Sequence, residues 1–495
     1  MLPARIVGSI NSEVGGNLVS TSHPLVVDLD GTLLHTDTLH ESALQMLRDH
    51  PASTLKIPAW LASGKAQMKR QISAVAQLNP ETLPYNQALL DWLREQRAAG
   101  RRLVLCTATD RPIAEGIARH LALFDEVMAS DGTVNLAGAN KAEALVARFG
   151  AGGFDYAGNS SADLAVWAKA REAIVVNAPK ALLASAQKKF TVSKVFAAPE
   201  RGFSVWRRAL RLHQWLKNLL IFMPLLAAHQ LGDGHAWGVL GLAFLAFSLC
   251  ASSVYLANDL LDLESDRLHP RKRNRPFASG VLPVWTGVVL APVLLAVSLL
   301  LAGRVGTSFQ GWLAFYFVLT CLYSWVLKRL ILIDCLTLAM LYTLRVLAGA
   351  AAVGLQLSFW LLAFSVFLFL SLAFVKRYAE LELQRESGRS KLHGRGYHTS
   401  DAPLIQTMGI TAGQASVLVL ALYLNSDAVT KLYKNPELVW GAVPVMLFWV
   451  HWMWMQAHRG QMHDDPLVFA VKDRISLVAG LAIALFLVAG TLGWL

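Results

Sequence analysis

Two carboxylates stand close together where a short apolar run ends near the start of the chain. The run Leu25–Leu29 contains Asp28 and leads directly into Asp30, and Gly31 follows. A strand with this ending directs both side chains into one loop, where they can hold Mg²⁺ and attack phosphorus. The alternative is an ordinary strand and turn with two solvated carboxylates.

Three further features follow in the order that phosphoryl-transfer chemistry needs. Thr107 ends a second apolar run in LVLCTATD, Lys141 opens a helical stretch in NKAEAL, and Asn159 to Asp163 follow a later run in GNSSAD. Together with the Asp28 loop, this set resembles the haloacid dehalogenase (HAD) phosphatase superfamily over roughly residues 22–180.

The resemblance implies a role for each of these positions. Asp28 would be the nucleophile that forms an aspartyl-phosphate, and Asp30 would be the general acid/base. Thr107 and Lys141 would hold the transferring phosphoryl group and offset the charge on its oxygens. The magnesium ligands implied by the resemblance are Asp28, Asp30, Asn159 and Asp163.

One of these positions departs from the family pattern. The last motif of the family usually begins Gly-Asp, whereas this chain has Asn159 after Gly158. The loss of one formal charge from a site for a hard cation should weaken Mg²⁺ binding. An active phosphatase and a degenerate, regulatory or structural domain therefore both stay open.

A second acidic cluster closes a long apolar stretch in the middle of the chain. Asp259, Asp262 and Asp266 are spaced three and four residues apart, so they share one helix face, and Asn258 borders that face as a candidate substrate ligand. Like charges stacked in this way repel one another and are costly near lipid. A divalent cation that in turn holds phosphates is the obvious compensation. The alternative is a solvated acidic helix end.

A basic run, HPRKRNRP, follows the acidic cluster directly. Positive charge on the cytoplasmic side of a membrane span is the simpler explanation, and it accounts for part of this run. Because acidic and basic residues adjoin, together they predict a site for Mg²⁺ and phosphate-bearing substrates, with arginine forks on the oxyanions. The candidate phosphate-binding residues are Arg267, Arg271, Lys272, Arg273 and Arg275.

The pattern NDxxDxxxD at the end of the second predicted span resembles the UbiA superfamily of intramembrane prenyltransferases, over about residues 205–495. The longer string NDLLDLESDRLHPRKRNRP is similar to the decaprenyl-phosphate phosphoribosyltransferase branch of that superfamily. The resemblance implies Mg²⁺-dependent transfer of phosphoribosyl from phosphoribosyl pyrophosphate (PRPP) to a polyprenyl phosphate, with Asp259 and Asp262 as catalytic residues. The fused HAD-like domain would then remove the 5-phosphate of the product.

Two other functions stay open for the membrane part. Aromatic prenyltransferases of the superfamily usually carry a second Asp-rich motif, where this chain offers only Asp334 beside Lys328. This difference weakens, without excluding, transfer of a prenyl group from a prenyl diphosphate to an aromatic or other acceptor. A transporter or lipid-binding membrane protein with a regulatory HAD domain is a third interpretation.

Further polar residues are expected on the same face of the membrane. Tyr323 and Lys328 extend the substrate-binding set. Arg345 lies inside an apolar stretch, where an arginine is a functional hypothesis by default, although an ion pair that holds the bundle together would also explain it. Lys376 and the pair Asp464–Asp465 either line the site or are solvated loop residues.

The elements that must position these groups are of two classes. The 495 residues are 54% hydrophobic and only 16% charged, which excludes a purely soluble chain and a disordered one. Residues 25–180 alternate short β-type runs with helical stretches and predict a doubly wound α/β domain, with His35–Gly100 as a helical cap. The predicted organisation is a leader at 1–20, a HAD-like domain at 21–180, a linker at 181–206 and a transmembrane domain at 207–495.

Nine apolar stretches of spanning length lie beyond the linker and predict an all-α membrane bundle of nine helices. Of the net charge of +11, +10 lies after residue 200 and between apolar runs, which argues against nucleic acid as a partner. With the N-terminal domain in the cytoplasm, 20 Lys and Arg residues fall on inside segments and 3 on outside segments. The sequence therefore predicts a multi-pass protein of a bacterial-type cytoplasmic membrane.

Overall fold

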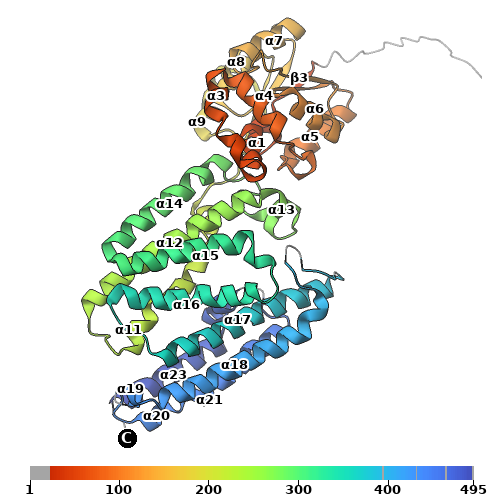
Figure 1. The fold of residues 1–495 in the computed structure, drawn as a ribbon. Helices are drawn as coiled ribbons and strands as arrows, with labels where there is room; N and C mark the ends of the chain where they lie inside the picture. The colour runs from red at the N-terminus through yellow and green to blue at the C-terminus, as the bar shows by residue number, and fades with distance from the viewer. Residues whose placement is uncertain (1–22, 389, 393–394, 431, 463–464, 493–495) are drawn as a thin grey trace, which may run out of the picture. The chain divides into compact units, whose positions relative to one another are not determined.

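The computed structural model divides the chain into two compact units, Met1–Glu200 and Arg201–Leu495, and each is described by itself (Figure 1). It describes residues 23–388, 390–392, 395–430, 432–462 and 465–492. The predicted leader at 1–20 lies outside the described residues.

A six-stranded parallel sheet with the order β3-β2-β1-β4-β5-β6 forms the centre of the first unit, as the sequence predicts for its fold class. The strands are β1 (Leu25–Val27), β2 (Leu103–Asp110), β3 (Glu126–Ser130), β4 (Asp155–Gly158), β5 (Ala173–Val176) and β6 (Val192–Phe196). Strand β6 and all of helix α9 (Lys180–Lys189) except its first residue lie in the range 181–206, where the sequence predicts a linker. The sheet therefore continues beyond residue 180.

Strand β1 lies in the middle of the sheet, which explains why all of its residues are apolar. Leu25 and Val27 belong to one core and Val26 to the other, because successive side chains of a strand point to opposite faces. The helices that cover the two faces include α5 (Gln87–Ala98), α6 (Arg111–Leu121), α7 (Ala139–Phe149) and α8 (Leu164–Trp167). Because β1 pairs with both β2 and β4, segments at the carboxyl ends of three neighbouring strands meet around Asp28.

A buried carboxylate at the first residue of β4 binds neighbouring segments through hydrogen bonds. Asp155 is fully buried, and its carboxylate accepts hydrogen bonds from Arg101, from Arg171 at 2.6 and 2.9 Å, and from the backbone N–H of Glu172 at 3.1 Å. This arrangement satisfies a buried charge with charged and neutral donors at once, so its loss should be costly.

We expect Asp155→Ala to lower the free energy of unfolding of this unit by about 3 kcal/mol, because both guanidinium groups lose their buried partner. The exposed pair of Arg94 and Asp91 is the matched control, and Asp91→Ala should cost less than about 1 kcal/mol. Urea-dependent proteolysis of this unit in the full chain measures both values. Equal losses in the two variants would contradict the prediction.

Between β1 and β2 the chain forms the helical cap that the sequence predicts. Its helices are α1 (Thr38–Asp49), α2 (Pro51–Thr54), α3 (Ile57–Ala62) and α4 (Lys65–Val75). Asp37 begins the cap, because its carboxylate accepts hydrogen bonds from the backbone N–H groups of Leu39 and His40 in the first turn of α1. Helix α5 then returns to the sheet and buries Leu89 and Leu93 in the core.

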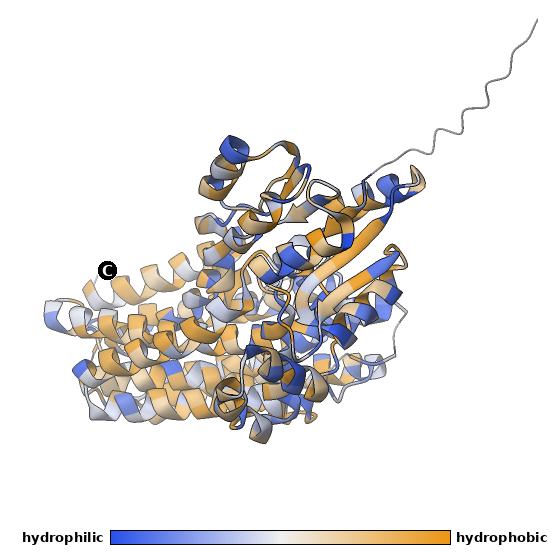
Figure 2. Ribbon diagram, turned by 90° about the horizontal axis from the view of Figure 1, so that it is seen from above, coloured by the Kyte–Doolittle hydropathy of each residue, from blue (hydrophilic) through white to orange (hydrophobic). Residues whose placement is uncertain are grey.

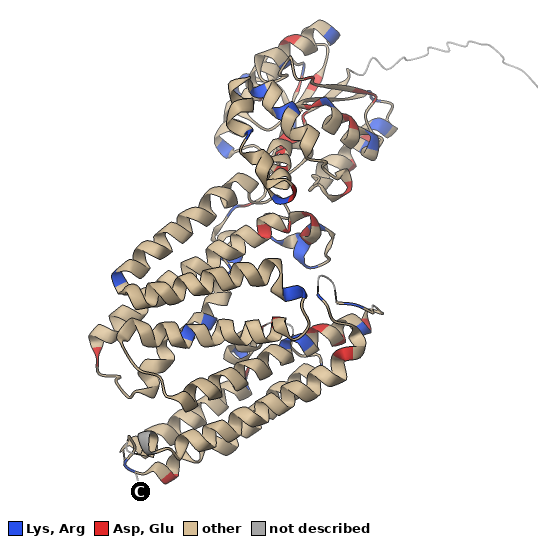
Figure 3. Cartoon of the chain, viewed as in Figure 1, with Lys and Arg blue, Asp and Glu red and all other residues tan. Residues whose placement is uncertain are grey.

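The second unit is a bundle of long apolar helices, and seven segments among the described residues are long and apolar enough to cross a membrane. These segments are Gly234–Leu261, Val284–Val305, Ile333–Val353, Phe359–Glu386, Thr399–Leu424, Pro436–His458 and Arg474–Leu492. Figure 2 shows that these helices are mostly hydrophobic, and Figure 3 shows most of their charged residues gathered towards one end of the bundle. The chain is therefore a multi-pass membrane protein.

The seven segments contain helices α12 (Gly234–Leu261), α14 (Val284–Val305), α16 (Ile333–Val353), α17 (Phe359–Glu386), α18 (Ala402–Leu424), α21 (Ala442–His458) and α23 (Arg474–Leu492). The other two predicted spans hold helix α15 (Thr307–Trp325) and a broken segment, in which the 3₁₀ helix η4 (Leu212–Phe222) precedes α11 (Met223–Ala227). The count of nine spans stays a prediction.

The broken segment brings polar side chains into the bundle. Arg211, just before η4, has a left-handed backbone with φ 51°, and Lys217 and Asn218 within η4 are buried. Segment η4 packs closely on α16, since a Cβ at Gly349 would lie 2.0 Å from the carbonyl oxygen of Ile221. Irregular backbone of this kind is tolerated in a membrane protein where it is covered by protein or lines a polar site.

Candidate functional site

The loop after β1 holds a buried carboxylate against an ammonium group. Asp28 is only 7% exposed, and Lys141 from the first turn of α7 donates a hydrogen bond from Nζ to Asp28 Oδ1 at 2.6 Å. The hydroxyl of Thr32 lies 3.4 Å from the other oxygen, Oδ2. Lys141 therefore fixes one carboxylate oxygen, and Oδ2 is the better placed of the two to attack a substrate.

A chain of hydrogen bonds continues from Lys141 to the loop after β4. Lys141 Nζ also donates to the hydroxyl of Tyr156 at 2.9 Å, and that hydroxyl donates to Asp163 Oδ1 at 2.8 Å. Asp163 Oδ2 accepts from the backbone N–H groups of Asn159 and Ser160 at 3.0 and 2.9 Å. Asp163 thus shapes the loop as well as facing the site. Tyr156 could not be predicted as a site residue from the sequence, because nothing in its spacing separates it from other strand residues.

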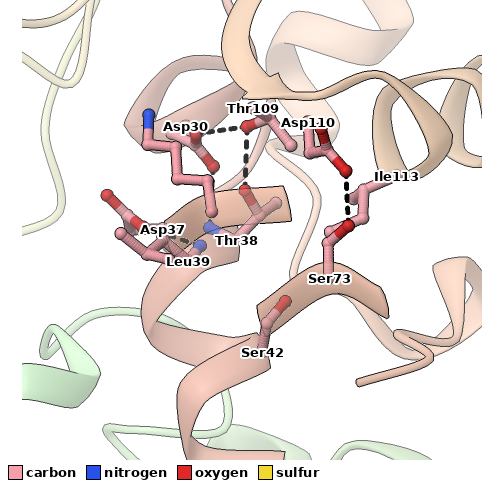
Figure 4. A pocket seen from close by; sticks show the side chains of 10 residues that line it. Asp30, Asp37, Thr38, Leu39, Ser42, Ser73, Thr109, Asp110 and Ile113 are labelled. Atoms are coloured by element: carbon pink, nitrogen blue, oxygen red, sulfur yellow. Dashed lines mark hydrogen bonds between the residues drawn. The ribbon is translucent and has the colours of Figure 1, made fainter. Parts of the chain in front are cut away.

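Asp30 faces the cap, where it borders a small cavity. Its Oδ1 accepts from the backbone N–H of Thr38 at 2.7 Å, and its Oδ2 accepts from the Thr109 hydroxyl at 2.6 Å (Figure 4). The cavity has a volume of about 40 Å³, and Ser73 and Asp110, which share a 2.5 Å hydrogen bond, lie on its wall. A carboxyl group at this boundary can exchange a proton with the leaving group of a small phosphate ester.

Thr107 lies in β2 and Asn159 directly follows β4, the two strands that pair with β1. Thr107 is fully buried, and its Oγ1 accepts from the backbone N–H of Thr109 at 3.0 Å, so its own hydrogen can serve another acceptor. Asn159 packs on the loop after β1, since a Cβ at Gly31 would lie 2.0 Å from Asn159 Nδ2. Gly31 also has φ +74°, a conformation that favours glycine.

Burial raises the pKa of the Asp28 carboxyl to about 7, although Lys141 opposes the shift, and the nearby carboxylates of Asp163 and Asp30 add to it. Burial by itself would lower the pKa of Lys141, but Asp28 and Asp163 raise it overall. The ammonium group is therefore charged at neutral pH, whereas Asp28 is near its midpoint. A cation beside Asp28 would favour the ionised carboxylate that nucleophilic attack requires.

In the second unit, two arginines contact the acidic cluster at the end of α12. Arg211 Nη2 makes a close ion pair with Asp259 Oδ1, and Arg275 Nη1 lies 3.1 Å from the same oxygen and 2.6 Å from Asp266 Oδ2. Both aspartates are buried. Asp266 Oδ1 has no hydrogen-bond partner among the described residues, and the ammonium of Lys272 is 3.9 Å away.

The helix is interrupted at Asp262, so the three aspartates do not lie on one regular helix as the sequence predicts. Helix α12 ends at Leu261, and α13 (Leu263–Leu268) follows. Asp262 still donates its backbone N–H to the Asn258 carbonyl at 2.9 Å and accepts from the N–H of Asp266 at 2.8 Å. Arg275 links Asp259 to Asp266, whereas Asp262 interacts electrostatically with Lys328 on a neighbouring loop. The side chain of Asn258 donates to Ser324 Oγ at 2.9 Å.

The five candidate phosphate-binding residues near the acidic cluster divide into three groups. Arg275 and Lys272 approach the acidic cluster, whereas Arg271 and Arg273 are exposed. Arg267 donates from Nε to the carbonyl oxygen of Ala278 at 2.9 Å, so it also holds the following loop in place.

No three His, Cys, Asp or Glu side chains in the described part of the chain converge closely enough to form a metal cage. Mg²⁺ commonly takes one or two carboxylates, substrate phosphates and waters instead, so an open set of ligands suits it. The buried, unpartnered Oδ1 of Asp266 and the raised pKa of Asp28 both fit a cation that arrives with a phosphate substrate.

Arg345 is buried within the bundle among neutral partners. Its Nε donates to Asn218 Oδ1 at 2.8 Å, and its Nη2 lies 3.3 Å from the Tyr316 hydroxyl. Its guanidinium carbon is 5.0 Å from the ring centre of Tyr316, 5.4 Å from that of Phe247 and 5.7 Å from that of Tyr342. Hydrogen bonds to neutral groups and aromatic faces leave the positive charge available to an anionic ligand.

A buried aspartate near Arg345 forms ion pairs with two lysines. Asp465 Oδ2 lies 2.7 Å from Lys217 Nζ and 3.5 Å from Lys376 Nζ, and it accepts a hydrogen bond from the Tyr342 hydroxyl at 2.7 Å. Asp464 lies outside the described residues. Lys217 and Tyr342 were not predicted as site residues. Lys217 counts among the Lys and Arg residues of the cytoplasmic segments whether or not it binds substrate, and nothing in the sequence separates Tyr342 from the other aromatic residues.

Asp334 is the acidic residue that this chain has where a second Asp-rich motif is usual, and its carboxylate is paired with basic residues. It is fully buried, with Arg377 Nη2 at 2.5 Å from Oδ2 and the Tyr397 hydroxyl at 2.5 Å from Oδ1. Arg395 Nη1 lies 3.4 Å from Asp334 and 3.1 Å from the hydroxyl of Tyr323. Glu380 also pairs with Arg377 and Arg395, so the cluster around Asp334 contains two carboxylates and two guanidinium groups.

Both units match known families. The model described as the UbiA prenyltransferase family matches residues 219–478, and the model described as haloacid dehalogenase-like hydrolase matches residues 25–167. A relative from Sinorhizobium fredii, named "Uncharacterized protein y4nM", is 38% identical over 465 residues, which cover 93% of this chain and 90% of the relative.

Two relatives match a smaller share of the chain. Nodulation protein NoeC from Azorhizobium caulinodans is 39% identical over 290 residues, covering 58% of this chain and 93% of NoeC. A protein named decaprenyl-phosphate phosphoribosyltransferase from Mycobacterium tuberculosis is 37% identical over 283 residues, covering 56% of this chain and 90% of that protein.

Proposed function

We propose that this chain, which belongs to the UbiA prenyltransferase family and carries an N-terminal haloacid dehalogenase-like hydrolase domain, moves phosphoribosyl from PRPP onto a polyprenyl phosphate. Support comes from its similarity to the mycobacterial protein named decaprenyl-phosphate phosphoribosyltransferase. The mixture of buried carboxylates and cations in the membrane unit also suits two phosphate-bearing substrates.

The ion pairs of Asp334 are the observation that favours PRPP as the donor. Ionising a prenyl diphosphate in a dry site calls for carboxylates and metal on both sides of the diphosphate, whereas Asp334 is already paired with Arg377 and contacted by Arg395. The cluster of Asp259 and Asp266 is also paired with arginines, but among the described residues Asp266 Oδ1 has no hydrogen-bond partner, so this cluster can hold the diphosphate of PRPP with Mg²⁺. The remaining phosphates of the two substrates would then meet arginine and lysine.

The residues divide the work by charge. When bound at Asp259, Asp262 and Asp266, Mg²⁺ would offset the charge that develops on the leaving diphosphate. Arg275 and Lys272 both lie within 4 Å of Asp266. Once Mg²⁺ neutralises that carboxylate, the two side chains would contact phosphate oxygens of the substrate instead.

The acceptor needs orientation more than activation. The oxygen of a lipid phosphate is already ionised at neutral pH, so attack on the anomeric carbon requires no strong base, and the transition state resembles an oxocarbenium ion. Arg345, which is near Tyr342, and Lys376, which is near Asp465, would hold the 5-phosphate or the lipid phosphate, and the apolar sides of the helices would accommodate the polyprenyl tail.

Double labelling tests the proposal. Membranes that contain the protein receive ribose-labelled PRPP, Mg²⁺ and a polyprenyl phosphate labelled in its phosphate. We expect one lipid product that carries both labels, and its formation should require Mg²⁺. A product that has lost the polyprenyl phosphate, formed only from a prenyl diphosphate, would contradict the proposal and favour prenyl transfer to an aromatic or other acceptor.

For the first unit we propose hydrolysis of the 5-phosphate of the lipid product. Asp28 attacks the phosphorus, Asp30 protonates the departing sugar oxygen, and water then hydrolyses the aspartyl-phosphate. Lys141 and Thr107 stabilise the phosphoryl oxygens, while Asn159 and Asp163 would share the Mg²⁺ site with Asp28 and Asp30. Both active sites would lie on the cytoplasmic side of a bacterial inner membrane, which the second unit would cross with nine spans.

Arg345→Gln should raise the KM for PRPP or polyprenyl phosphate and lower kcat/KM by about 100-fold, because it removes a buried positive charge from the proposed phosphate-binding residues. Arg345→Lys should recover part of this loss, since it restores the charge without the planar fork. The matched control is Arg304→Gln, which removes an exposed cation from α14 and should leave the kinetics unchanged. Parental kinetics for Arg345→Gln would contradict the assignment.

The raised pKa of Asp28 predicts a pH-dependent affinity for Mg²⁺ in the first unit. Below about pH 7 a proton occupies Asp28 and competes with the cation, so affinity should rise as the pH is raised from 6 to 8. We expect Mg²⁺ to protect this unit of the full chain from proteolysis more strongly at pH 8 than at pH 6. Asp28→Asn should remove the difference, and a parental protein with equal protection at both pH values would contradict the prediction.

A further inference from the structure

One part of the cap is apolar yet contains no fully buried residue. The segment 55–62 reads LKIPAWLA, and none of its eight residues is buried. Leu55 is 83% exposed and Leu61 is 50% exposed, and helix α3 contributes no buried residue to the unit. A helix that is mostly apolar and buries nothing inside its own protein is expected to bury its surface elsewhere.

The charge around this segment is entirely positive. Between Asp49 and Glu81 the chain has Lys56, Lys65, Lys69 and Arg70 and not one Asp or Glu residue. Lys56 and Lys65, at the two ends of the apolar segment, are exposed. Lys69 is turned to the sheet domain, where its Nζ donates to the carbonyl of Ala108 at 2.8 Å. The segment therefore combines exposed leucines and a half-buried tryptophan with two exposed lysines, in a stretch of sequence that holds no acidic residue.

We propose that the cap segment 55–62 is a membrane-docking surface that inserts into the headgroup region of an anionic bilayer. Leucine and tryptophan with flanking lysines are the composition of interfacial anchors, which gain affinity both from apolar burial and from attraction to acidic lipid. The bilayer is the natural occupant, because the membrane unit begins at Arg201, directly after the soluble unit ends. Docking keeps the hydrolase unit at the lipid surface and holds whether or not that unit is active.

The docking surface is separable from the fold. Because α3 buries no residue, substitutions on it should leave the unit intact, whereas α1 and α4 bury Leu44 and Ile72 and join the cap to the rest of the unit. Leu55, Lys56 and Leu61 are exposed, as is Lys65 at the first position of α4, so variants at these four positions can report on the surface alone.

A fluorescent label at position 55 tests the proposal in the full chain. The Leu55→Cys variant, in a Cys321→Ser background that removes the less buried native thiol, is labelled with an environment-sensitive fluorophore. The protein is reconstituted at one copy per nanodisc with 30% phosphatidylglycerol and 70% phosphatidylcholine. Nitroxide groups near the lipid headgroups should quench this label strongly. The matched label at the exposed, polar Gln187 of α9 should be quenched much less.

The charge and apolar contributions are then removed separately. Lys56→Glu together with Lys65→Glu should lower the docking equilibrium constant by at least about fivefold for each lysine, as should replacing the acidic lipid with phosphatidylcholine. Leu61→Glu should also release the label.

Three results would overturn the proposal. They are equal quenching at positions 55 and 187, quenching unaffected by the lysine and leucine variants, and protection of position 55 only when two copies share a disc. The last result would identify a second copy of the chain as the partner. Unchanged resistance of the first unit to proteolysis in each variant verifies that a loss of quenching reflects lost docking.

Discussion

Asp259→Ala should lower phosphoribosyl transfer by at least about 100-fold, the largest effect expected for a single change in the membrane unit. Asp259 is buried where α12 ends, and it accepts the contacts of Arg211 and Arg275 on one oxygen, Oδ1. Its removal takes a carboxylate from the proposed Mg²⁺ site and also frees two arginines that would otherwise be oriented for the substrate. Transfer of ribose label from PRPP into the lipid phase measures the effect.

Asp233→Ala is the matched control on the same helix. Asp233 caps the opposite end of α12, where its carboxylate accepts from the backbone N–H of Ala236 at 3.0 Å. Both variants lose one negative charge from α12, but the control should cost only about 1 kcal/mol of local helix stability and leave transfer near the parental rate. Equal transfer by Asp259→Ala and the parent would show that the acidic cluster is a structural feature of the helix end.

The β-strands of the first unit were predictable wherever apolar residues run without interruption. Strands β1, β4 and β5 are buried on both faces, so nearly every residue in them is apolar and the signal is local. Strand β6 was missed because it lies at the edge of the sheet. Its residues alternate between partly exposed and exposed positions, and Lys194 and Ser193 dilute the apolar run.

The proposed sites were predictable where charge is repeated at a fixed spacing, as in the two acidic motifs. Contacts between residues that are far apart in the chain have no comparable pattern in the sequence. Nothing in the sequence near Asp465 indicates that Lys217 is bonded to it from 248 positions earlier in the chain. Likewise, Asp334 is an ordinary acidic residue in the sequence, and only the fold shows that Arg377 and Tyr397 occupy its carboxylate. Which charges pair with one another in the membrane unit could therefore be determined only from the structure.

Asp28→Asn should stop release of the 5-phosphate from the lipid product, with a loss of more than about 1,000-fold, because it removes the attacking oxygen. The substitution is nearly isosteric, so Lys141 retains a neutral hydrogen-bond partner in place of the carboxylate at 2.6 Å. Transfer by the second unit should continue, and the doubly labelled lipid should accumulate with its 5-phosphate still attached.

The fate of that lipid decides between the two interpretations of Asn159. If the parent releases 5-phosphate and Asp28→Asn does not, the Lys141–Tyr156–Asp163 chain supports hydrolysis even though the loop begins with an amide. Asp91→Asn is the control, since it removes an exposed carboxylate from the same unit and should leave release unchanged. If the parent and Asp28→Asn release phosphate equally fast, the first unit is not the phosphatase. Its buried ion pair would then serve stability or regulation.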